Sequence, residues 1–244
     1  MHTTNKTILI TGGGSGIGFA FAKALSENNK VIITGRSEDR LKKAAAQLKD
    51  VSWFAVDVNN GAQVDALVEF VEGEFGGLDI LVNNAGTAFV HQLDAGEGAY
   101  EKAAQEMDTN YLSVIRLTDK FLPQLRKSAE AAIVNVSSIV AFVPRVRLAT
   151  YAASKAALHA YTQALRHTLA QTTGIKVFEV MPPLVDTEFS AEIGGANGIP
   201  PSQVADHLLY GLAHDQYELH TGDTEKVYQL FHSNPEGAFG VLNS

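Results

Sequence analysis

Short runs of β-branched and other apolar residues alternate along the chain with longer stretches in which apolar residues recur every three or four positions. The short runs predict strands at Thr7 to Thr11, Val31 to Thr34, Trp53 to Val56, Ile80 to Asn83, Ala132 to Val136 and Lys176 to Val180. The longer stretches predict helices around Phe19 to Leu25, Leu41 to Leu48, Val64 to Val71, Tyr111 to Leu125 and Tyr151 to Leu169. This alternation is typical of parallel strands joined by crossover helices.

Most of the predicted strands are almost continuously apolar rather than alternately apolar and polar. Strands have this composition when helices cover both faces of their sheet. We therefore predict an α/β fold with a doubly wound parallel sheet of about seven strands and helices on both faces. A helix from about Ser202 to His214, with Ser202 as its N-cap, and a short strand near Tyr217 to Thr221 complete the pattern.

The segment at residues 186–200 differs from the rest of the chain because it is glycine-rich and lacks sustained periodicity. Such a composition is typical of a surface loop, and we expect a substrate lid there. The chain has no internal repeat or low-complexity tract. Its 244 residues suit one full-sized core, so we predict a single domain over residues 1–244.

Composition narrows the classes of partner. A formal net charge of -8 at pH 7 argues against broad attraction to nucleic acid or anionic lipid. The absence of cysteine excludes disulfides and thiolate metal sites, and the eight histidines lack metal-ligand spacing, so no metal is predicted. No apolar run is long enough to span a bilayer, and the first residues do not read as a secretory signal. We expect a cytoplasmic protein.

A glycine-rich turn follows the first predicted strand as Thr11-Gly12-Gly13-Gly14-Ser15-Gly16-Ile17-Gly18, and a helical pattern begins directly after it. Glycines at such a junction allow unusual backbone angles and close approach of a pyrophosphate, whose charge the helix start favours. The alternative is a tight turn that only lets helix and strand pack closely. The turn has no Gly-Lys-Ser/Thr ending, so nucleoside triphosphate hydrolysis is not expected. The arrangement predicts a Rossmann-type dinucleotide site with contacts from Gly12, Gly14, Ser15, Gly16, Ile17 and Gly18.

Arg36 follows the second predicted strand, where a dinucleotide fold contacts the adenosine ribose. An acidic residue there prefers a free 2′-hydroxyl, whereas an arginine pairs with a 2′-phosphate. We therefore favour NADP(H) over NAD(H) as the cofactor. The alternative for Arg36 is a solvent-facing turn residue.

Tyr151 and Lys155 are four residues apart at the start of a predicted helix, which places them on one helix face. An adjacent ammonium stabilises a phenolate, so we expect Lys155 to lower the pKa of Tyr151 toward neutrality. The alternative is an amphipathic helix with a snorkelling lysine. Ser138 favours a catalytic site, because it ends a buried strand at the edge where open α/β sheets bind ligands.

These motifs together resemble the short-chain dehydrogenase/reductase family, and the resemblance covers nearly the whole chain. They occur in the family's order as Thr11-Gly-x-x-x-Gly16-x-Gly18, Asp57, Asn83-Asn84-Ala85-Gly86, Asn110, Ser138, Tyr151-x-x-x-Lys155 and Pro182 to Thr187. The resemblance implies that Ser138 hydrogen-bonds the substrate oxygen, Tyr151 exchanges its proton, and Lys155 binds the nicotinamide ribose. It also implies that Asn110 holds a proton-relay water. Hydride would then pass between the nicotinamide and a carbonyl or alcohol carbon.

Further cofactor contacts are implied by the resemblance for Asp57, Val58, Asn84, Ala85, Gly86, Pro182, Val185 and Thr187, besides Tyr151 and Lys155. Asp57 would contact the adenine amine or, equally, form a turn or helix cap. Thr187 would touch the cofactor or else cap the first turn of the lid. The family's usual Pro-Gly is Pro182-Pro183 here, and the second proline removes an amide from the nicotinamide side.

Substrate contacts are expected from residues that follow the motif-bearing strands or lie in the lid, namely Phe89, His91, Val140, Phe142, Arg145 and Phe189. Ordinary packing or a surface position is the alternative for each. Arg145 and Arg147 would attract an acidic substrate, although the sequence favours a solvated or subunit-facing role. By the resemblance, helices near Lys102 to Leu125 and Tyr151 to Leu169 pair between subunits in a homodimer or homotetramer.

The sequence therefore predicts an NADP(H)-dependent oxidoreductase that acts on a small-molecule carbonyl or alcohol, with Tyr151 as general acid/base. An NAD(H)-dependent dehydrogenase of the same family is one alternative. A non-catalytic dinucleotide-binding regulator is another, and the intact set of Asn110, Ser138, Tyr151 and Lys155 argues against it. A sugar-nucleotide epimerase or dehydratase on the related longer scaffold would need an extra C-terminal substrate domain.

Overall fold

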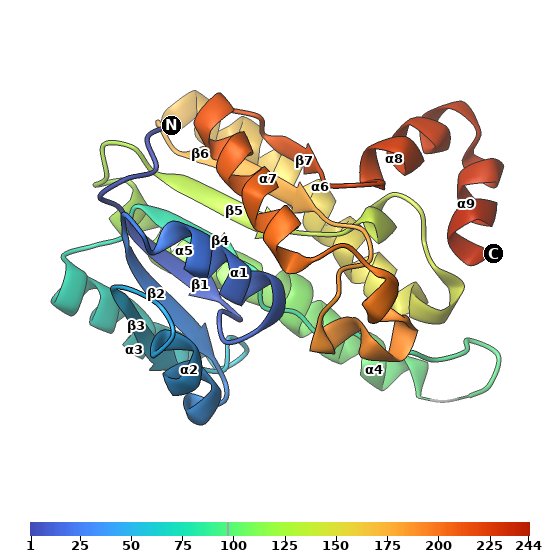
Figure 1. Ribbon diagram of the computed structural model, residues 1–244, viewed down its shortest axis with the longest axis horizontal. Helices are drawn as coiled ribbons and strands as arrows, with labels where there is room; N and C mark the ends of the chain where they lie inside the picture. The colour runs from blue at the N-terminus through green and yellow to red at the C-terminus, as the bar shows by residue number, and fades with distance from the viewer. Residues whose placement is uncertain (97) are drawn as a thin grey trace.

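The computed structural model describes residues 1–96 and 98–244. Seven strands form one sheet in the order β3-β2-β1-β4-β5-β6-β7, and all neighbouring strands are parallel (Figure 1). The strands are β1 (Thr7–Thr11), β2 (Lys30–Gly35), β3 (Val51–Ala55), β4 (Ile80–Asn83), β5 (Ala132–Val136), β6 (Lys176–Met181) and β7 (Glu218–His220). The predicted fold class and strand number are confirmed.

Helices connect the strands and extend the chain beyond the last one. The α-helices are α1 (Gly16–Leu25), α2 (Glu38–Ala45), α3 (Gly61–Phe75), α4 (Ala99–Met107), α5 (Ser113–Leu125), α6 (Ala149–Thr172), α7 (Pro201–His214), α8 (Thr224–Ser233) and α9 (Pro235–Asn243). A π-helical turn, η1 (Asp108–Leu112), precedes α5. Short 3₁₀ helices are η2 (Ile139–Ala141), η3 (Val146–Leu148), η4 (Glu188–Ile193) and η5 (Gly195–Asn197).

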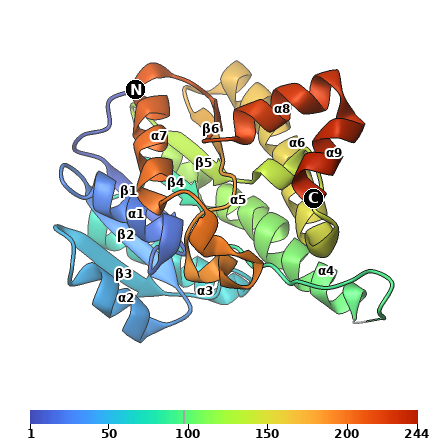
Figure 2. The same cartoon turned by 45° about the vertical axis from the view of Figure 1, so that its right-hand side comes forward.

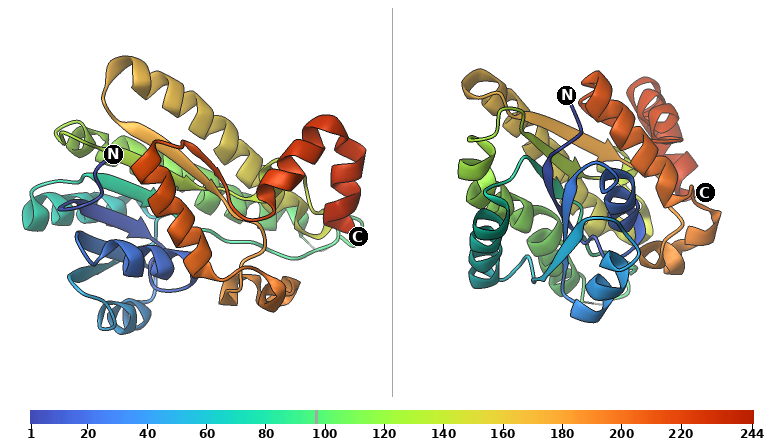
Figure 3. Two further views of the ribbon diagram at one scale, coloured as in Figure 1. Left: turned by 45° about the horizontal axis from the view of Figure 1, so that its top comes forward. Right: turned by 60° about the vertical axis from the view of Figure 1, so that its left-hand side comes forward.

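The two faces of the sheet carry separate apolar clusters, because successive side chains of a strand point to opposite faces. Ile8 and Ile10 of β1 belong to a cluster with side chains of α1, α2 and α7. Leu9, which lies between them in β1, belongs to a second cluster with side chains of α3, α5 and α6. Helices therefore cover both faces, as Figure 3 shows and as the continuously apolar strands predict.

Three details of the expected elements differ from the structure. Helix α7 begins at Pro201, so Ser202 is inside the helix and its predicted N-cap role is wrong. Proline suits the first helical position because its φ is close to the helical value. A backbone N–H at this position would have no intrahelical acceptor, so its absence in proline costs no hydrogen bond. The lid segment is not a plain loop, because η4 and η5 lie within it. Helices α8 and α9 have no counterpart among the predicted elements.

The C-terminal helices pack against the body of the protein through a third apolar cluster. Buried Val227 of α8 and Ala238 of α9 join Val140, Val143 and Ala152, which belong to η2, the loop after it and α6. Figures 1 and 2 show the red α8–α9 hairpin beside one end of α6. The end of the chain therefore reaches the helix that carries Tyr151 and Lys155.

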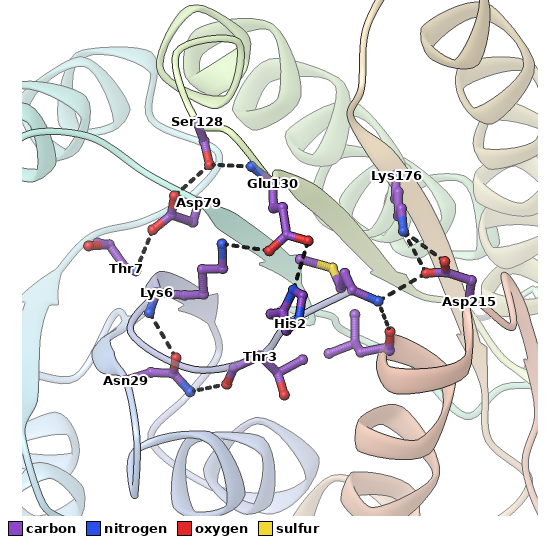
Figure 4. A network of polar contacts seen from close by, with 12 residues as sticks. His2, Thr3, Lys6, Thr7, Asn29, Asp79, Ser128, Glu130, Lys176 and Asp215 are labelled. Carbon is purple, nitrogen blue, oxygen red and sulfur yellow. Dashed lines mark hydrogen bonds and ion pairs between the residues drawn. The ribbon is translucent and has the colours of Figure 1, made fainter.

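A polar network lies at the amino-terminal edge of the sheet, away from the strand ends that carry the motifs (Figure 4). Asp79, just before β4, accepts hydrogen bonds from the Thr7 amide at 2.8 Å and the Ser128 hydroxyl at 2.5 Å. Lys176 at the start of β6 donates to Asp215 at 2.8 Å. These contacts connect the segments that begin β1, β4 and β5, and they join the start of β6 to the segment before β7.

We expect Asp79→Ala to lower the free energy of unfolding by about 1–3 kcal/mol, because the Thr7 amide and the Ser128 hydroxyl would lose their acceptor. Urea unfolding followed by circular dichroism measures the change. The control is Asp65→Ala, whose half-exposed carboxylate pairs with Lys120 at the surface. This variant should change the free energy by less than about 1 kcal/mol. Equal losses in both variants would contradict the role given to Asp79.

Candidate active site

A cavity of about 600 Å³ lies at the carboxyl ends of β1, β4, β5 and β6. The strand order places β1 beside β4. Strands β2 and β3 continue the sheet on one side of this pair, and β5, β6 and β7 continue it on the other. Open α/β sheets bind ligands at such a reversal, outside the carboxyl ends of the strands. The predicted site residues that line the cavity are Gly12, Ser15, Gly16, Ile17, Asn84, Ala85, Gly86, Ser138, Tyr151, Lys155, Pro182, Val185 and Thr187.

The glycine turn after β1 is fixed against the end of β4. The Thr11 hydroxyl oxygen accepts hydrogen bonds from the amides of Asn84 and Ala85 at 2.9 and 3.0 Å. The Asn84 side chain in turn donates to the Thr11 carbonyl at 2.9 Å. A Cβ atom on Gly18 would collide with the Gly12 carbonyl oxygen, and Gly12 itself has a φ of 66°. Glycine is needed at both positions, for close packing and for the left-handed backbone.

The start of α1 faces the cavity without a capping side chain. Ser15 is the N-cap residue, but its hydroxyl makes no capping hydrogen bond, and the first turn of α1 contains no acidic residue. Ser15, Gly16 and Ile17 line the cavity. Amides in the first turn of a helix lack intrahelical acceptors, and the helix dipole is positive there. This helix start fits an anionic group such as the pyrophosphate of a dinucleotide.

Several predicted cofactor residues lie outside the cavity wall. Gly14 faces α2, and Gly18 packs within the turn. Arg36 is exposed after β2, and Val58 is buried in the cluster beneath α3 and α5. The Asp57 carboxylate accepts a hydrogen bond from the backbone amide two residues later at 3.0 Å. Asp57 therefore has the turn role that the sequence allowed as one of two alternatives.

Tyr151, Lys155 and Ser138 meet in the cavity wall. Lys155 is 4% exposed, and its Nζ donates to the Val136 carbonyl at 2.8 Å. The same Nζ lies 5.7 Å from the centre of the Tyr151 ring. Ser138 is the N-cap of η2, and its hydroxyl oxygen accepts from the Val140 amide at 3.3 Å. Two elements, the end of β5 and the start of α6, thus bring a hydroxyl, a phenol and an ammonium together.

Burial dominates the protonation of Tyr151 and Lys155. Burial raises the pKa of Tyr151, hydrogen bonding with Ser138 opposes the rise, and the charge of Glu106 adds to it. Burial lowers the pKa of Lys155 to about 8, although the charge of Glu179 acts in the other direction. The predicted lowering of the Tyr151 pKa by Lys155 is therefore wrong. Desolvation of the buried phenolate is the dominant effect, and the Lys155 ammonium lies 5.7 Å from the ring centre and is bound to a backbone carbonyl.

Asn110 lies behind the cavity wall in the π-helical turn η1 and is 1% exposed. Its Oδ1 accepts from the Thr87 amide at 2.8 Å, and its Nδ2 donates to the Thr87 carbonyl at 2.9 Å and to the Ser154 hydroxyl at 2.8 Å. Ser154 donates to the Tyr151 carbonyl at 2.7 Å. These bonds connect the loop after β4 to the first turns of α6. No separate signal in the sequence points to Ser154, which stands directly before Lys155.

A second buried polar group lies near Lys155. Glu179 of β6 is fully buried, and its carboxylate accepts from the Ser137 hydroxyl at 2.5 Å and lies 2.9 Å from His159 Nδ1. Burial lowers the pKa of His159, but hydrogen bonding and attraction to Glu179 outweigh burial and raise it overall. The one signal in the sequence for this buried group is a glutamate that stands between Phe178 and Val180.

A hydrogen bond joins the two ends of the lid segment, and the first turn of the segment lines the cavity. The Asp186 amide donates to the Ile199 carbonyl at 2.9 Å. Thr187 starts η4, where its amide donates to the Ser190 hydroxyl at 3.4 Å, and it also lines the cavity. Phe189 places its ring centre 6.1 Å from that of Tyr151. Thr187 thus stands at the N-cap position of η4 and in the cavity wall.

The expected substrate residues divide into two groups. Val140, Arg145 and Phe189 line the cavity. Phe89, His91 and Phe142 lie outside its wall, and the Phe142 ring packs edge-on against the His159 ring at 5.0 Å. The C-terminal hairpin contributes further lining residues that the sequence did not suggest, namely Asp223, Lys226, Val227, Val241 and Leu242.

Two features of other classes of protein are absent from the residues that the structure describes. No helix in this part of the chain is long and apolar enough to cross a membrane. The same residues contain no group of three or more histidine, cysteine, aspartate or glutamate side chains arranged to hold a metal ion.

A parallel sheet with a glycine turn and a tyrosine–lysine pair in one cavity defines a Rossmann-type oxidoreductase. Residues 6–197 match the family model described as short chain dehydrogenase. The chain is 36% identical over 252 residues to the protein of Bacillus subtilis (strain 168) named "Uncharacterized oxidoreductase DltE", and the match covers 100% of this chain and 99% of that relative. The chain therefore belongs to the short-chain dehydrogenase/reductase family and is an enzyme of that family.

Solved structures agree with this assignment. A short chain dehydrogenase from Burkholderia cenocepacia J2315, solved in complex with NADP, has a TM-score of 0.88 and 27% sequence identity, with 100% of both chains covered. A short chain dehydrogenase/reductase from Burkholderia phymatum, solved in complex with NAD, has a TM-score of 0.89, with 97% of this chain and 96% of that chain covered. Its 24% identity supports the fold alone.

The lowered pKa of Lys155 predicts a pH dependence of stability. A lysine that titrates near pH 8 when folded and near its ordinary 10.5 when unfolded binds fewer protons in the folded state between these values. Its contribution should therefore make the free energy of unfolding increase as pH rises from 8 to 10.5. Urea unfolding at pH 7.5 and 9.5 should show a larger gain for the wild type than for Lys155→Met. Parallel changes in the two proteins would contradict the lowered pKa.

Proposed function

We propose that the chain is an NADP(H)-dependent oxidoreductase that transfers a hydride between the nicotinamide and a small-molecule carbonyl or alcohol, with Tyr151 as general acid/base. The observation that carries this proposal is the meeting of Tyr151, Lys155 and Ser138 in the cavity that also receives the glycine turn. Membership of the family supports the reaction class. The NADP-bound relative from Burkholderia cenocepacia supports a nicotinamide dinucleotide as cofactor.

The glycine turn and the start of α1 would hold the dinucleotide. Ser15, Gly16 and Ile17 would place their backbone at its pyrophosphate, where the open helix start favours negative charge. Lys155 would bind the nicotinamide ribose from the opposite wall. A Cβ on Gly86 would stand 3.2 Å from Asn110 Oδ1 and 3.8 Å from Lys155 Nζ, so glycine keeps this part of the cavity clear. When bound, the cofactor supplies or accepts the hydride.

Tyr151 would move the proton. Burial keeps its hydroxyl protonated, which is the form that donates to the oxygen of a carbonyl undergoing reduction. Lys155, with a pKa of about 8, is an ammonium at neutral pH and would stabilise the phenolate left behind. Ser138 would donate a hydrogen bond to the same substrate oxygen. Oxidation of an alcohol uses the same contacts in reverse.

Asn110 would support proton transfer from behind the wall. It fixes the first turn of α6 through Ser154, whose hydroxyl donates to the Tyr151 carbonyl. The Oδ1 atom of Asn110 accepts from the Thr87 amide, and a carbonyl oxygen has a second lone pair for the relay water that the family resemblance implies.

Arg36 is the residue that supports NADP(H) over NAD(H). It follows β2 at the adenosine side of the fold, is exposed, and forms no ion pair with any residue that the structure describes. Nearby Arg40 is already engaged, because its guanidinium pairs with Glu188 of the lid at 3.0 and 3.1 Å. Arg36 is therefore the better-placed cation for a 2′-phosphate.

Residues 186–200 would act as a substrate lid. Phe189 lines the cavity beside Tyr151 while its side chain is still 53% exposed, so closure of the segment would cover the cavity with an apolar ring. The assembly we propose is a homodimer or homotetramer paired through helices within residues 102–125 and 151–169. Leu112, the last residue of η1 directly before α5, offers an exposed apolar side chain to such a contact.

Replacing Tyr151 with Phe should lower kcat at least about 100-fold, because the proton donor is lost while the ring remains. The measurement is oxidation of NADPH by a panel of aldehydes and ketones, followed by the absorbance of the reduced nicotinamide. Tyr161→Phe is the matched control, because Tyr161 is in the same helix but outside the cavity wall. The assignment of Tyr151 as acid/base would be wrong if Tyr151→Phe kept the wild-type kcat.

Arg36→Ala should weaken NADPH binding about ten-fold or more and leave NADH binding almost unchanged, because only NADPH carries the 2′-phosphate. Fluorescence titration of each reduced cofactor gives the dissociation constants. Arg126→Ala removes an exposed arginine just after α5 and is the control. Wild-type protein that binds the two cofactors equally, or NADH more tightly, would defeat the preference for NADP(H).

A further inference from the structure

Charged side chains around the cavity are mostly neutralised by partners. Besides Lys155, the charged residues in the wall are Arg145, Glu188, Glu192, Asp223 and Lys226. Lys226 pairs with Asp223 at 2.7 Å, and Glu188 pairs with an arginine of α2 at 3.0 Å. Arg145 and Glu192 form no ion pair with the residues that the structure describes. Apart from Lys155, the charged groups of the wall without an ion-pair partner among the described residues are thus the guanidinium of Arg145 and the carboxylate of Glu192.

The backbone of Arg145 is held from both sides by one side chain. The Val146 amide donates to Asn243 Oδ1 at 2.8 Å, and Asn243 Nδ2 donates to the Pro144 carbonyl at 3.1 Å. Asn243 belongs to α9, so the C-terminal helix clamps the loop at the residues before and after Arg145. A fixed backbone reduces the conformational entropy that a binding side chain loses when its ligand arrives. Glu192, by contrast, is exposed on η4 of the lid.

The surroundings of Arg145 favour an anion as its partner. A guanidinium stays charged at all working pH values and presents a planar set of donors that matches two oxygens of a carboxylate or phosphate. Arg145 is partly buried, and the cavity wall to which it belongs also includes the apolar side chains of Val140, Leu148 and Val227. Charge-assisted hydrogen bonds are stronger in such a setting than in bulk water.

We propose that the cavity takes carbonyl substrates that carry an anionic oxygen group, a carboxylate or a phosphate, and that Arg145 binds this group. The carbonyl would lie at Tyr151 and Ser138, and an apolar body would join it to the anion. This substrate class rests on the proposed oxidoreductase function. Asn243 is a positioning residue, because it acts on the substrate only through the loop that carries Arg145.

The test compares three ketones that differ at one end: 3-benzoylpropionate, its methyl ester, and 4-oxo-4-phenylbutyl phosphate. The full chain reduces each with NADPH, and the readout is the ratio of kcat/KM for each anion to kcat/KM for the ester. We expect a ratio of about ten or more, produced mainly by a lower KM for the anion. The larger of the two anion ratios identifies carboxylate or phosphate as the preferred group.

Arg145→Gln should reduce the ratio at least about ten-fold, because glutamine keeps a polar side chain but removes the charge. Arg147→Gln is the matched control, since Arg147 is exposed two residues away and outside the cavity wall. This control should keep the ratio within about two-fold of wild type. Asn243→Ala should lower the ratio through KM, with kcat for the ester retained. Reduction of ester and anions with equal kcat/KM would overturn the substrate class and leave the oxidoreductase function intact.

A binding measurement separates this proposal from the proposed function. Isothermal titration with 4-phenylbutyrate, 4-phenylbutyramide and 4-phenylbutylamine, in the presence of NADP, needs no turnover. We expect the acid to bind at least about ten-fold more tightly than the amide, and Arg145→Gln to remove the difference. If the acid binds more tightly in this way but none of the ketones is reduced, the result would support anion binding by Arg145 and count against the oxidoreductase function. Preferential binding of the amine, lost in Glu192→Gln, would overturn the proposal.

Discussion

Parallel pairing of the central strands is the constraint on which the rest of the structure depends. Because β1, β4, β5 and β6 run in one direction and pair in register, their carboxyl ends meet at one edge of the sheet. The glycine turn, the Asn84 loop, Ser138 and the proline pair each follow one of these strand ends. Strand pairing therefore brings them together, although they are far apart in the sequence. The opposite edge carries the polar network of Asp79 and Asp215, which stabilises the strand starts and leaves the other edge to ligands.

The packing that forms the cavity also sets the chemistry of its wall. Burial opposes ionisation of both Tyr151 and Lys155, so the phenol stays protonated and the ammonium becomes easier to deprotonate. Two sets of hydrogen bonds hold these groups from behind. Asn110 and Ser154 fix the first turn of α6, and Glu179 accepts from Ser137 and pairs with His159 one turn beyond Lys155. The position and the protonation of the reactive side chains are therefore properties of the surrounding core.

The outer half of the cavity comes from segments that belong to neither layer of helices. The lid contributes Thr187 and Phe189, and the C-terminal hairpin contributes Val227 and several neighbours. The hairpin packs through the third apolar cluster, which also includes Tyr151. Its last helix holds the Arg145 loop through Asn243. The inner half thus carries the motifs common to the family, whereas the outer half carries the substrate contacts that we propose for this chain.

The sequence by itself determined the parts that depend on local pattern. Continuous apolar runs predicted β1, β4 and β5 to the residue, and glycine and tyrosine–lysine spacing identified the inner half of the site, because period and spacing are properties of neighbouring residues. Only the tertiary structure decided the pKa of Tyr151, which depends on how deeply the phenol is buried. It alone brought Glu179 to His159 and Asn243 to the Arg145 loop, since these partners are far apart along the chain. Contacts of this kind arise from packing, and no local pattern encodes them.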